Sequence, residues 1–298
     1  MKIRIRNVAA FAVLAHALAL ILYAAPARAA SAEAQTTYSE IQGALGLVPT
    51  FMKDFPEEAI AAVWAEYKGT ELDPASALPG KYKELIGLAV AAQIPCRYCI
   101  YFHSAAARLN GATDREIKEA VAVAAIVRQW STVLNGNQID EAEFRGEVAR
   151  VLDFAKKPHP EAAPVAVVDE ASALRDITQT LGLVPGFFRR FPGPGLAGAW
   201  LEFKTLQLNP SSAIPNKYKE LIGLAVSAQI PCRYCTAFHT ETSKAFGASD
   251  KEQHEAIAMA SITRHWSTWL NGSQQDEAGF RKDVDAIVKY LKRGPAKK

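Results

Sequence analysis

The hydrophobic and polar positions of the chain repeat with the spacing of helices. In KYKELIGLAVAAQI (residues 81–94) apolar residues fall on nearly every face of a helix, which indicates a helix that is buried on all sides. Pro95 ends this helix, because proline has no backbone N–H to continue it. A second helix is predicted to start at the cysteines that follow and to run to Leu109, where Asn110-Gly111 supplies a C-terminal stop.

A third and longer helix is predicted after this stop. Thr113 followed by Glu116 forms a capping box, and the helix that it opens is expected to end near Asn135-Gly136. We find no convincing alternation of apolar and polar residues of the kind that strands show, and the short VAVV run at 165–168 lies in a proline-containing segment. The pattern therefore predicts an all-α fold.

Nearly the whole pattern occurs twice, at an offset of 136 residues. Trp64 pairs with Trp200, and between residues 80–103 and 216–239 only four of 24 positions differ. Such a period is too long for a solenoid unit, and each copy is long enough to bury a core of its own, so two tandem helical domains are expected. The predicted boundaries are a leader at 1–29, a first helical domain at 30–157, a linker at 158–168, a second helical domain at 169–292 and a basic tail at 293–298.

The leader is predicted to be a cleaved signal peptide. It has a basic start with Lys2 and Arg4, an apolar run from Val8 to Ala25, and the small-x-small pattern of a cleavage site at Ala27-Arg28-Ala29. The alternative is a transmembrane anchor, because the apolar run is nearly long enough to span a bilayer. Cleavage is the preferred interpretation, and a periplasmic or secreted location is expected.

Removal of the leader changes the charge of the chain. The full sequence has 34 Lys and Arg residues against 31 Asp and Glu residues, a formal net charge of +3. Four of the basic residues and no acidic residue lie in the leader, so the remainder has 30 against 31 and a charge near −1. Nothing in that balance favours nucleic acid or a membrane surface as a partner. The composition, 49% hydrophobic and 22% charged, excludes a disordered or fibrous chain.

The sequence I-P-C-R-Y-C-x-x-F-H occurs in both copies and combines groups that are suited to redox chemistry. At the start of a helix, Cys96, Cys99 and His103 lie on one face, because residues three and four apart are neighbours. The unpaired N–H groups and the positive dipole end of that helix stabilise a thiolate. Such cysteines have pKa values of roughly 3.5–7.5 in place of about 8.5. The equivalent residues of the second copy are Cys232, Cys235 and His239.

Glu84 and its copy Glu220 complete the predicted site. Glu84 lies ten residues before the turn at Ile94 and His103 lies nine after it, so two antiparallel helices bring them to similar depth. Glu84 is expected to orient or deprotonate His103, directly or through water, and His103 to take the proton of Cys99. The apolar residues beside Glu84 are expected to raise the pKa of its carboxyl group.

A Glu twelve positions before a C-x-x-C motif, with a His four positions after the second Cys, resembles the AhpD-like branch of the carboxymuconolactone decarboxylase superfamily, whose members are all-helical. The resemblance implies a peroxidase of the alkylhydroperoxidase or peroxiredoxin type, with redox-active disulfides Cys96–Cys99 and Cys232–Cys235. The second cysteine of each pair is implied to attack peroxide, and the first to resolve the resulting sulfenic acid. No metal or organic cofactor is implied. Related domains form symmetric assemblies, which implies a homo-oligomer.

Two features depart from that family. The well-known alkylhydroperoxidase has a further histidine between its cysteines, where this chain has Tyr98 and Tyr234. A phenol with a pKa near 10 carries protons less well at neutral pH, so a simpler or slower relay is expected. Family enzymes of this type also take electrons from a cytoplasmic lipoyl adaptor, which an exported protein would not meet. The thiol reductant is therefore unknown.

Other interpretations of the same residues stay open. The cysteine pairs also suit a thiol–disulfide oxidoreductase, or a carboxymuconolactone decarboxylase-like protein whose disulfides are only structural. Cys, Cys, His and Glu could together bind zinc, although ligands on adjacent turns of one helix fit such a site poorly. His103 and His239 could be core histidines. Trp130 and Trp266, with the residues around them, are interpreted as core packing.

Overall fold

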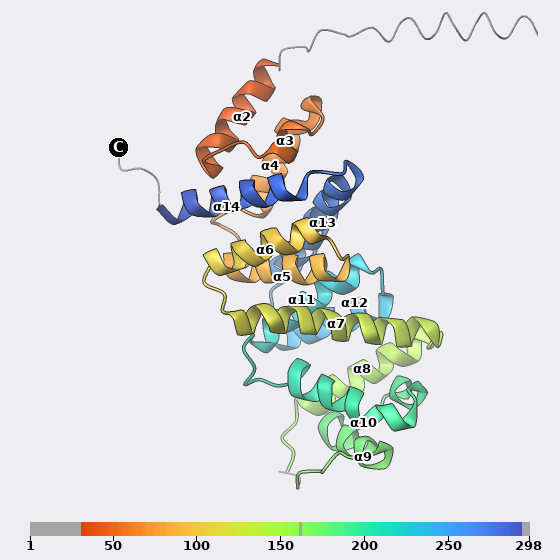
Figure 1. The fold of residues 1–298 in the computed structure, drawn as a ribbon. Coiled ribbons are helices and arrows are strands. Elements are labelled where there is room, and N and C mark those ends of the chain that lie inside the picture. The colour runs from red at the N-terminus through yellow and green to blue at the C-terminus, as the bar shows by residue number, and fades with distance from the viewer. Residues whose placement is uncertain (1–30, 161–162, 294–298) are drawn as a thin grey trace, which may run out of the picture.

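The computed structural model describes residues 31–160 and 163–293, and within them every regular element is helical (Figure 1). The predicted all-α fold is confirmed. The predicted signal peptide lies outside the described residues, as do residues 294–298 of the predicted tail. The α-helices are α2 (Ala32–Leu45), α3 (Thr50–Lys53), α4 (Ile60–Thr70), α5 (Gly80–Gln93), α6 (Arg97–Leu109), α7 (Asp114–Gly136), α8 (Glu141–Ala155), α9 (Glu170–Leu181), α10 (Gly193–Glu202), α11 (Asn216–Gln229), α12 (Arg233–Ala245), α13 (Asp250–Gly272) and α14 (Glu277–Arg293).

The helix ends lie where the sequence predicts them. α5 begins after Pro79 and ends at Gln93, one residue before the turn that contains Pro95. α6 has Cys96 as its N-cap. α7 opens with the predicted capping box, in which the Thr113 hydroxyl accepts from the Glu116 N–H and the Glu116 carboxylate accepts from the Thr113 N–H.

The two repeats share the main hydrophobic core and also a smaller cluster around α9 and α10. α5 and α11 pack against each other, and their Tyr82 and Tyr218 rings stack with centroids 3.4 Å apart. α13 of the second repeat covers α5, and α7 of the first repeat covers α11. The expectation that each copy buries its own core is wrong, because α5 and α11 are buried by helices of both repeats. The domain boundaries given above stay a prediction.

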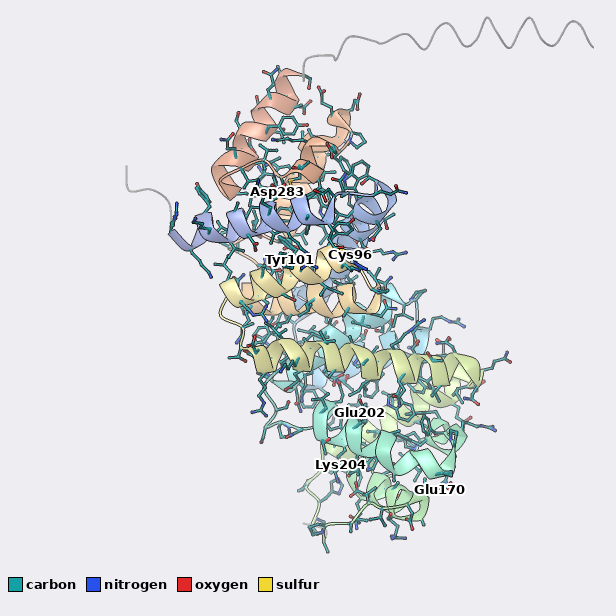
Figure 2. All side chains as sticks on the ribbon, in the orientation of Figure 1. Cys96, Tyr101, Glu170, Glu202, Lys204 and Asp283 are labelled. Atoms are coloured by element: carbon teal, nitrogen blue, oxygen red, sulfur yellow. A yellow bond between two sulfur atoms is a disulfide. The ribbon has the colours of Figure 1, made fainter. Side chains whose placement is uncertain are left out.

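The last helix of each repeat lies on the cysteine-bearing helix of the other repeat. α14 packs along α6, and α8 packs on α12. Figure 2 shows Cys96 and Tyr101 on α6 next to α14, which bears Asp283. The Tyr101 hydroxyl donates to Asp285 on α14 at 2.6 Å, and Tyr98 donates to the Gln275 carbonyl at 2.6 Å. In the second repeat Tyr234 donates in the same way to the Ile139 carbonyl at 2.5 Å. The tyrosines between the cysteines therefore hold the repeats together.

A glutamate on each long helix fastens a loop of the opposite repeat. Glu255 on α13 accepts hydrogen bonds from the backbone N–H groups of Ala77 (2.9 Å) and Leu78 (2.7 Å), just before α5. Glu119 on α7 accepts from Ala213 and Ile214 in the equivalent loop, at 2.7 and 3.1 Å. Burial raises the pKa of the Glu255 carboxyl, but the N–H donors lower it further, so that the pKa lies below its ordinary value.

Replacing Glu255 by alanine is expected to lower the free energy of unfolding by about 1–3 kcal/mol, because it leaves buried N–H groups without acceptors. Urea denaturation measures the loss, and Glu241→Ala on the exposed face of α12 serves as the control. Because the pKa of Glu255 is lower in the folded than in the unfolded chain, its carboxylate stabilises the fold at pH values above the unfolded pKa. This stabilisation is lost as the pH falls through the folded pKa. The difference in free energy of unfolding between wild type and Glu255→Gln should therefore become smaller below about pH 4.3. Equal stabilities at pH 7 would contradict the assignment.

Candidate functional site

The cysteines of each pair are held at the start of one helix. Cys96 is the N-cap of α6, and its sulfur accepts from the Cys99 N–H at 3.3 Å. The predicted Cys96–Cys99 disulfide is present. The predicted Cys232–Cys235 disulfide is not formed in this structure: the two residues are buried free thiols with their sulfurs 3.0 Å apart. The same geometry therefore accommodates both the disulfide and the dithiol.

Each predicted glutamate contacts its predicted histidine directly. His103 Nδ1 lies 2.8 Å from Glu84 Oε2, and His239 Nδ1 lies 2.7 Å from Glu220 Oε2. All four side chains are buried. The antiparallel arrangement of α5 with α6, and of α11 with α12, brings each pair to one depth, as the helix rise predicts. No water is needed to connect carboxyl group and imidazole.

A glycine on each central helix makes room for the imidazole. A Cβ atom added to Gly87 would lie 2.4 Å from His103 Cε1, and one added to Gly223 would lie 2.3 Å from His239 Cε1. Real Cβ atoms do not approach other atoms so closely. Each histidine ring therefore lies directly against the backbone of the neighbouring helix, which keeps Nδ1 within reach of the glutamate.

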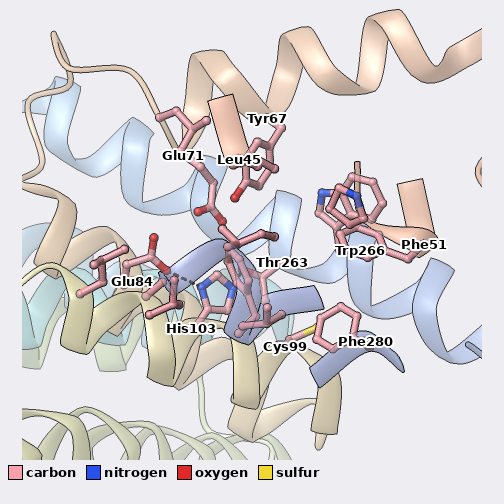
Figure 3. Close-up of a pocket in the computed structure, with 18 of the residues that line it drawn as sticks. Leu45, Phe51, Tyr67, Glu71, Glu84, Cys99, His103, Thr263, Trp266 and Phe280 are labelled. Carbon is pink, nitrogen blue, oxygen red and sulfur yellow. Dashed lines mark hydrogen bonds and ion pairs between the residues drawn. The ribbon is translucent and has the colours of Figure 1, made fainter. Parts of the chain in front are cut away.

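The first site opens into a cavity that both repeats build (Figure 3). Cys99 and His103 lie on its floor, and the cavity holds about 120 Å³. Thr263 and Trp266 of α13 and Phe280 of α14 line it from the second repeat. The Thr263 hydroxyl lies 3.3 Å from His103 Nε2. The predicted residues Glu84, Cys99 and His103 thus come from one repeat, whereas the other repeat supplies part of the cavity wall.

The second site is built in the same way from the opposite halves. Cys235 and His239 line a cavity of about 300 Å³, whose walls include Trp130 of α7 and Phe144 of α8 from the first repeat. Its lining is almost entirely apolar. The tryptophans that were interpreted as packing thus also form walls of the two cavities. In each pair only the second cysteine lines the cavity, and the first lies behind it.

The first cysteine of the reduced pair is the more acidic of the two, so that a thiolate forms there first. A hydrogen bond from the Cys235 thiol lowers the pKa of Cys232 to about 5, although burial acts in the opposite direction. The Ser131 hydroxyl, the Cys235 N–H and the Asn135 amide also donate to this sulfur and lower its pKa further. Cys235 keeps its proton, because the neighbouring sulfur and burial raise its pKa. The resemblance implies attack by Cys235, so the proton between the sulfurs must first move to Cys232.

An asparagine from the opposite repeat supports that thiolate. Asn135 Nδ2 on α7 donates to Cys232 Sγ at 3.3 Å, and Asn271 Nδ2 on α13 lies 3.5 Å from Cys96 Sγ. From the sequence alone, the Asn-Gly pairs are predicted only to end helices. Because these pairs recur at the same offset as the cysteines, the repeat could have indicated that their asparagines belong to the site.

The Asn135→Ala variant is expected to raise the pKa of Cys232 by about one pH unit, because a hydrogen bond to a charged group is worth about 1.5–3 kcal/mol. The pH dependence of thiol alkylation, followed by mass spectrometry of the peptide, measures it. Asn137→Ala is the matched control, since Asn137 bonds only its own helix, at the Val133 carbonyl. An alkylation profile that is identical in Asn135→Ala and wild type would exclude the role.

The two sites differ in the buried partners of the glutamate. Glu71 lies beside Glu84 in the first site, and the equivalent position of the second repeat is Gln207, whose amide donates to Glu220 at 2.7 Å. Burial raises the pKa of both Glu71 and Glu84 to about 8, whereas the pKa of Glu220 lies below its ordinary value because His239 and hydrogen-bond donors outweigh burial. Burial lowers the pKa of His103.

The side chains that could hold a metal ion in the first site include no cysteine. Among the described residues, Glu71, Glu84 and His103 bring one ligand atom each within 4.8 Å of one another. The zinc site considered from the sequence uses both cysteines, and in this structure Cys96 and Cys99 are bonded to each other. Comparison of the two repeats does not reveal Glu71 as a site residue, because the equivalent position of the second repeat is Gln207.

Comparisons with known proteins identify relatives of each repeat. The model of the carboxymuconolactone decarboxylase family matches residues 58–142 and 194–275. An uncharacterized protein 4 in the cox locus of Paracoccus denitrificans is 40% identical over 62 residues, which are 21% of this chain and 56% of that protein. The chain thus spans about half the length of this curated relative.

A solved structure shares the fold across both repeats. It is provisionally described as a gamma-carboxymuconolactone decarboxylase subunit from Burkholderia xenovorans LB400. It is 16% identical, covers 88% of this chain and 98% of its own, and gives a TM-score of 0.54. Because the aligned part exceeds either repeat, the likeness extends to the way in which the two halves pack.

Proposed function

The chain belongs to the carboxymuconolactone decarboxylase family, and on that premise we propose that it is an exported, thiol-dependent peroxidase of the AhpD-like branch. One observation carries the proposal. A cysteine pair presents its second sulfur, beside an imidazole held by a buried glutamate, to an apolar cavity. The arrangement occurs twice, and the decarboxylation for which the family is named has no need of paired cysteines.

The proposed reaction consumes two thiols for each peroxide. The Cys235 sulfur, after its proton has moved to Cys232 or His239, attacks the terminal oxygen of the hydroperoxide. The S–O bond forms as the O–O bond breaks, and the leaving alkoxide takes up a proton and departs as alcohol. The Cys232 sulfur then attacks the sulfenic acid, water leaves, and the disulfide forms. An external thiol reductant returns two electrons to the pair.

The glutamate–histidine pair accepts and donates the proton during this reaction. A carboxylate hydrogen-bonded to Nδ1 fixes the orientation of the imidazole and stabilises its protonated form. The other ring nitrogen then exchanges a proton with thiol or leaving oxygen. Apolar walls exclude water, which favours organic hydroperoxides and protects the sulfenic acid until the neighbouring cysteine reaches it.

Export rests on the sequence of the first 29 residues. Their basic start, apolar run and small-residue cleavage pattern support a signal peptide and hence a periplasmic or secreted protein. Among the helices of residues 31–160 and 163–293, none has the length and hydrophobicity needed to cross a bilayer. Mass spectrometry of the N-terminus after expression in a bacterial host with cell fractionation tests this part.

Stopped-flow mixing of the reduced protein with cumene hydroperoxide tests the activity. The expected result is the loss of up to two thiols per site, with disulfides at both pairs found by peptide mass spectrometry. Unchanged thiols would overturn the proposal. If the pairs instead exchange rapidly with a small disulfide and ignore peroxide, the protein is a thiol–disulfide oxidoreductase, which the lowered pKa of Cys232 also suits.

Assembly of several chains is a further part of the proposal. The two repeats already pack with approximate two-fold symmetry, so any homo-oligomer would join chains that each hold a complete pair of sites. Light scattering after size-exclusion chromatography, compared with the chain mass of 32.3 kDa, tests it.

A further inference from the structure

The two sites, which otherwise repeat each other, differ in the groups around the glutamate. In the first site Glu71 from the C-cap of α4 reaches the Glu84 carboxyl, and its Oε2 is buried without a hydrogen-bond partner. Figure 3 shows Glu71 pointing towards Glu84 and His103 at the cavity. In the second site the Gln207 amide and the Thr242 hydroxyl both donate to Glu220. Ala106 replaces Thr242 in the first repeat.

These partners give the glutamates of the two sites different protonation states. Glu71 and Glu84 bring carboxyl oxygens within 4.8 Å of each other, and both side chains are more than nine-tenths buried. They cannot both be ionised, because their like charges repel in a site that excludes water. The Glu71–Glu84 pair therefore holds a proton. Glu220 needs none, because an amide, a hydroxyl and His239 all donate to its oxygens. The first site thus holds a carboxylic acid where the second holds an amide that cannot release a proton at neutral pH.

Among the residues that the structure describes, the charged or titratable groups that interact with the pair lie on α4, α5 and α6. Tyr67 lies on α4, Lys83 on α5 and His103 on α6. Lys83 is bonded to the Thr70 carbonyl at 3.1 Å, and its charge opposes the rise in pKa only partly. α13 contributes uncharged Thr263 and Trp266, and α14 contributes apolar residues to the cavity. Glu71 and Glu84 are therefore the two carboxyl groups among the residues that line this cavity, and Glu84 is bonded to His103.

We propose that Glu71 is a proton donor of the first site, which passes its proton to the leaving oxygen when the O–O bond of a hydroperoxide breaks. The inference rests on the proposed function. Cys99 forms the S–O bond, and the alkoxide takes the Glu71 proton to become alcohol. The proton that left the Cys99 thiol moves through His103 to Glu84 and restores the pair. In the second site, His239 must serve both as base and as acid.

Variants that leave one site intact test the role. Cys232→Ser plus Cys235→Ser isolates the first site, and Cys96→Ser plus Cys99→Ser isolates the second. In the first background, Glu71→Gln reproduces the partner found in the second site. It is expected to slow the reaction with tert-butyl hydroperoxide by about 10²-fold, the usual contribution of general acid catalysis. Peracetic acid should be affected far less, because its leaving carboxylate needs no proton.

The contrast between the two peroxides separates proton donation from structure. Equal losses with both peroxides, or no loss with either, would overturn the proposal. Gln207→Glu in the second background is the reciprocal variant, and it should raise the rate with tert-butyl hydroperoxide relative to that with peracetic acid. An unchanged ratio would also count against proton donation.

A spectroscopic readout is independent of activity. Infrared difference spectra of the whole chain should show a protonated carboxyl band at neutral pH that Glu71→Gln removes and Gln207→Glu duplicates. If neither site reacts with peroxide but this band behaves as expected, the proposed function is wrong, whereas the proton on the Glu71–Glu84 pair is confirmed. If the band is missing and elemental analysis finds one divalent cation per chain, a metal ion occupies the place of the proton, and the proposal is overturned.

Discussion

Replacing Cys99 and Cys235 together by serine is expected to abolish peroxide reduction, with a loss of about 10³-fold or more in the rate. A serine hydroxyl at neutral pH is protonated and far less nucleophilic than a thiolate, and these are the only two sulfurs of the described pairs that line the cavities. The measurement is the second-order rate of peroxide consumption by the reduced protein in stopped flow.

The companion variant replaces the first cysteines, Cys96 and Cys232. It should still react once with peroxide, because the cavity-facing thiols remain. Without a resolving thiol, the sulfenic acid persists or is oxidised further to sulfinic acid, which mass spectrometry detects. If this variant is inert and the Cys99 and Cys235 variant is active, the roles within each pair are reversed, as the low pKa of Cys232 would then explain.

The Gly87→Ala plus Gly223→Ala variant is expected to damage both activity and stability. Each new methyl group would lie within 2.4 Å of an imidazole carbon, so the ring must leave its glutamate or the helices must separate. Overpacking of this kind costs typically about 1–3 kcal/mol at each position. Loss of the glutamate contact should also slow peroxide reduction by about 10²-fold. Denaturation curves and stopped-flow rates measure the two effects.

Gly69→Ala in α4 is the matched control for these substitutions. A methyl group there meets no atom within 4 Å, and the residue is in a helix, so the change should be neutral or stabilise the fold by up to about 1 kcal/mol. Should the Gly87 and Gly223 variant unfold with the same midpoint as wild type and keep its rate, the histidine does not depend on those glycines.

The local structure was open to prediction because its causes are local. The capping box at Thr113 and the proline after Ile94 set helix ends through neighbours in the sequence. The contact between Glu84 and His103 followed from the helix rise alone, since both lie at nearly equal distance from one turn. These features needed no knowledge of the rest of the chain.

What packs on the central helices was not predictable in the same way. Apolar residues on every face of α5 indicate burial, but not which helix covers them. Thr263 reaches His103 across 160 positions of the chain, and no periodicity encodes such a pairing. Glu71 escaped detection for the opposite reason: it breaks the repeat that drew attention to the other site residues. Departures from an internal repeat therefore merit the same scrutiny as its matches.

The packing of α5 against α11, where the partly buried Tyr82 and Tyr218 rings stack, bears on how the chain folds. The first repeat finds its missing walls only in α13 and α14, at the far end of the chain, so it stays incomplete until nearly all of the polypeptide is available. Formation of the first cavity then requires closure of the 160-residue separation between His103 and Thr263, which slows folding. Unfolding should consequently be one cooperative transition, and a chain that ends after the first repeat should not be a stable protein.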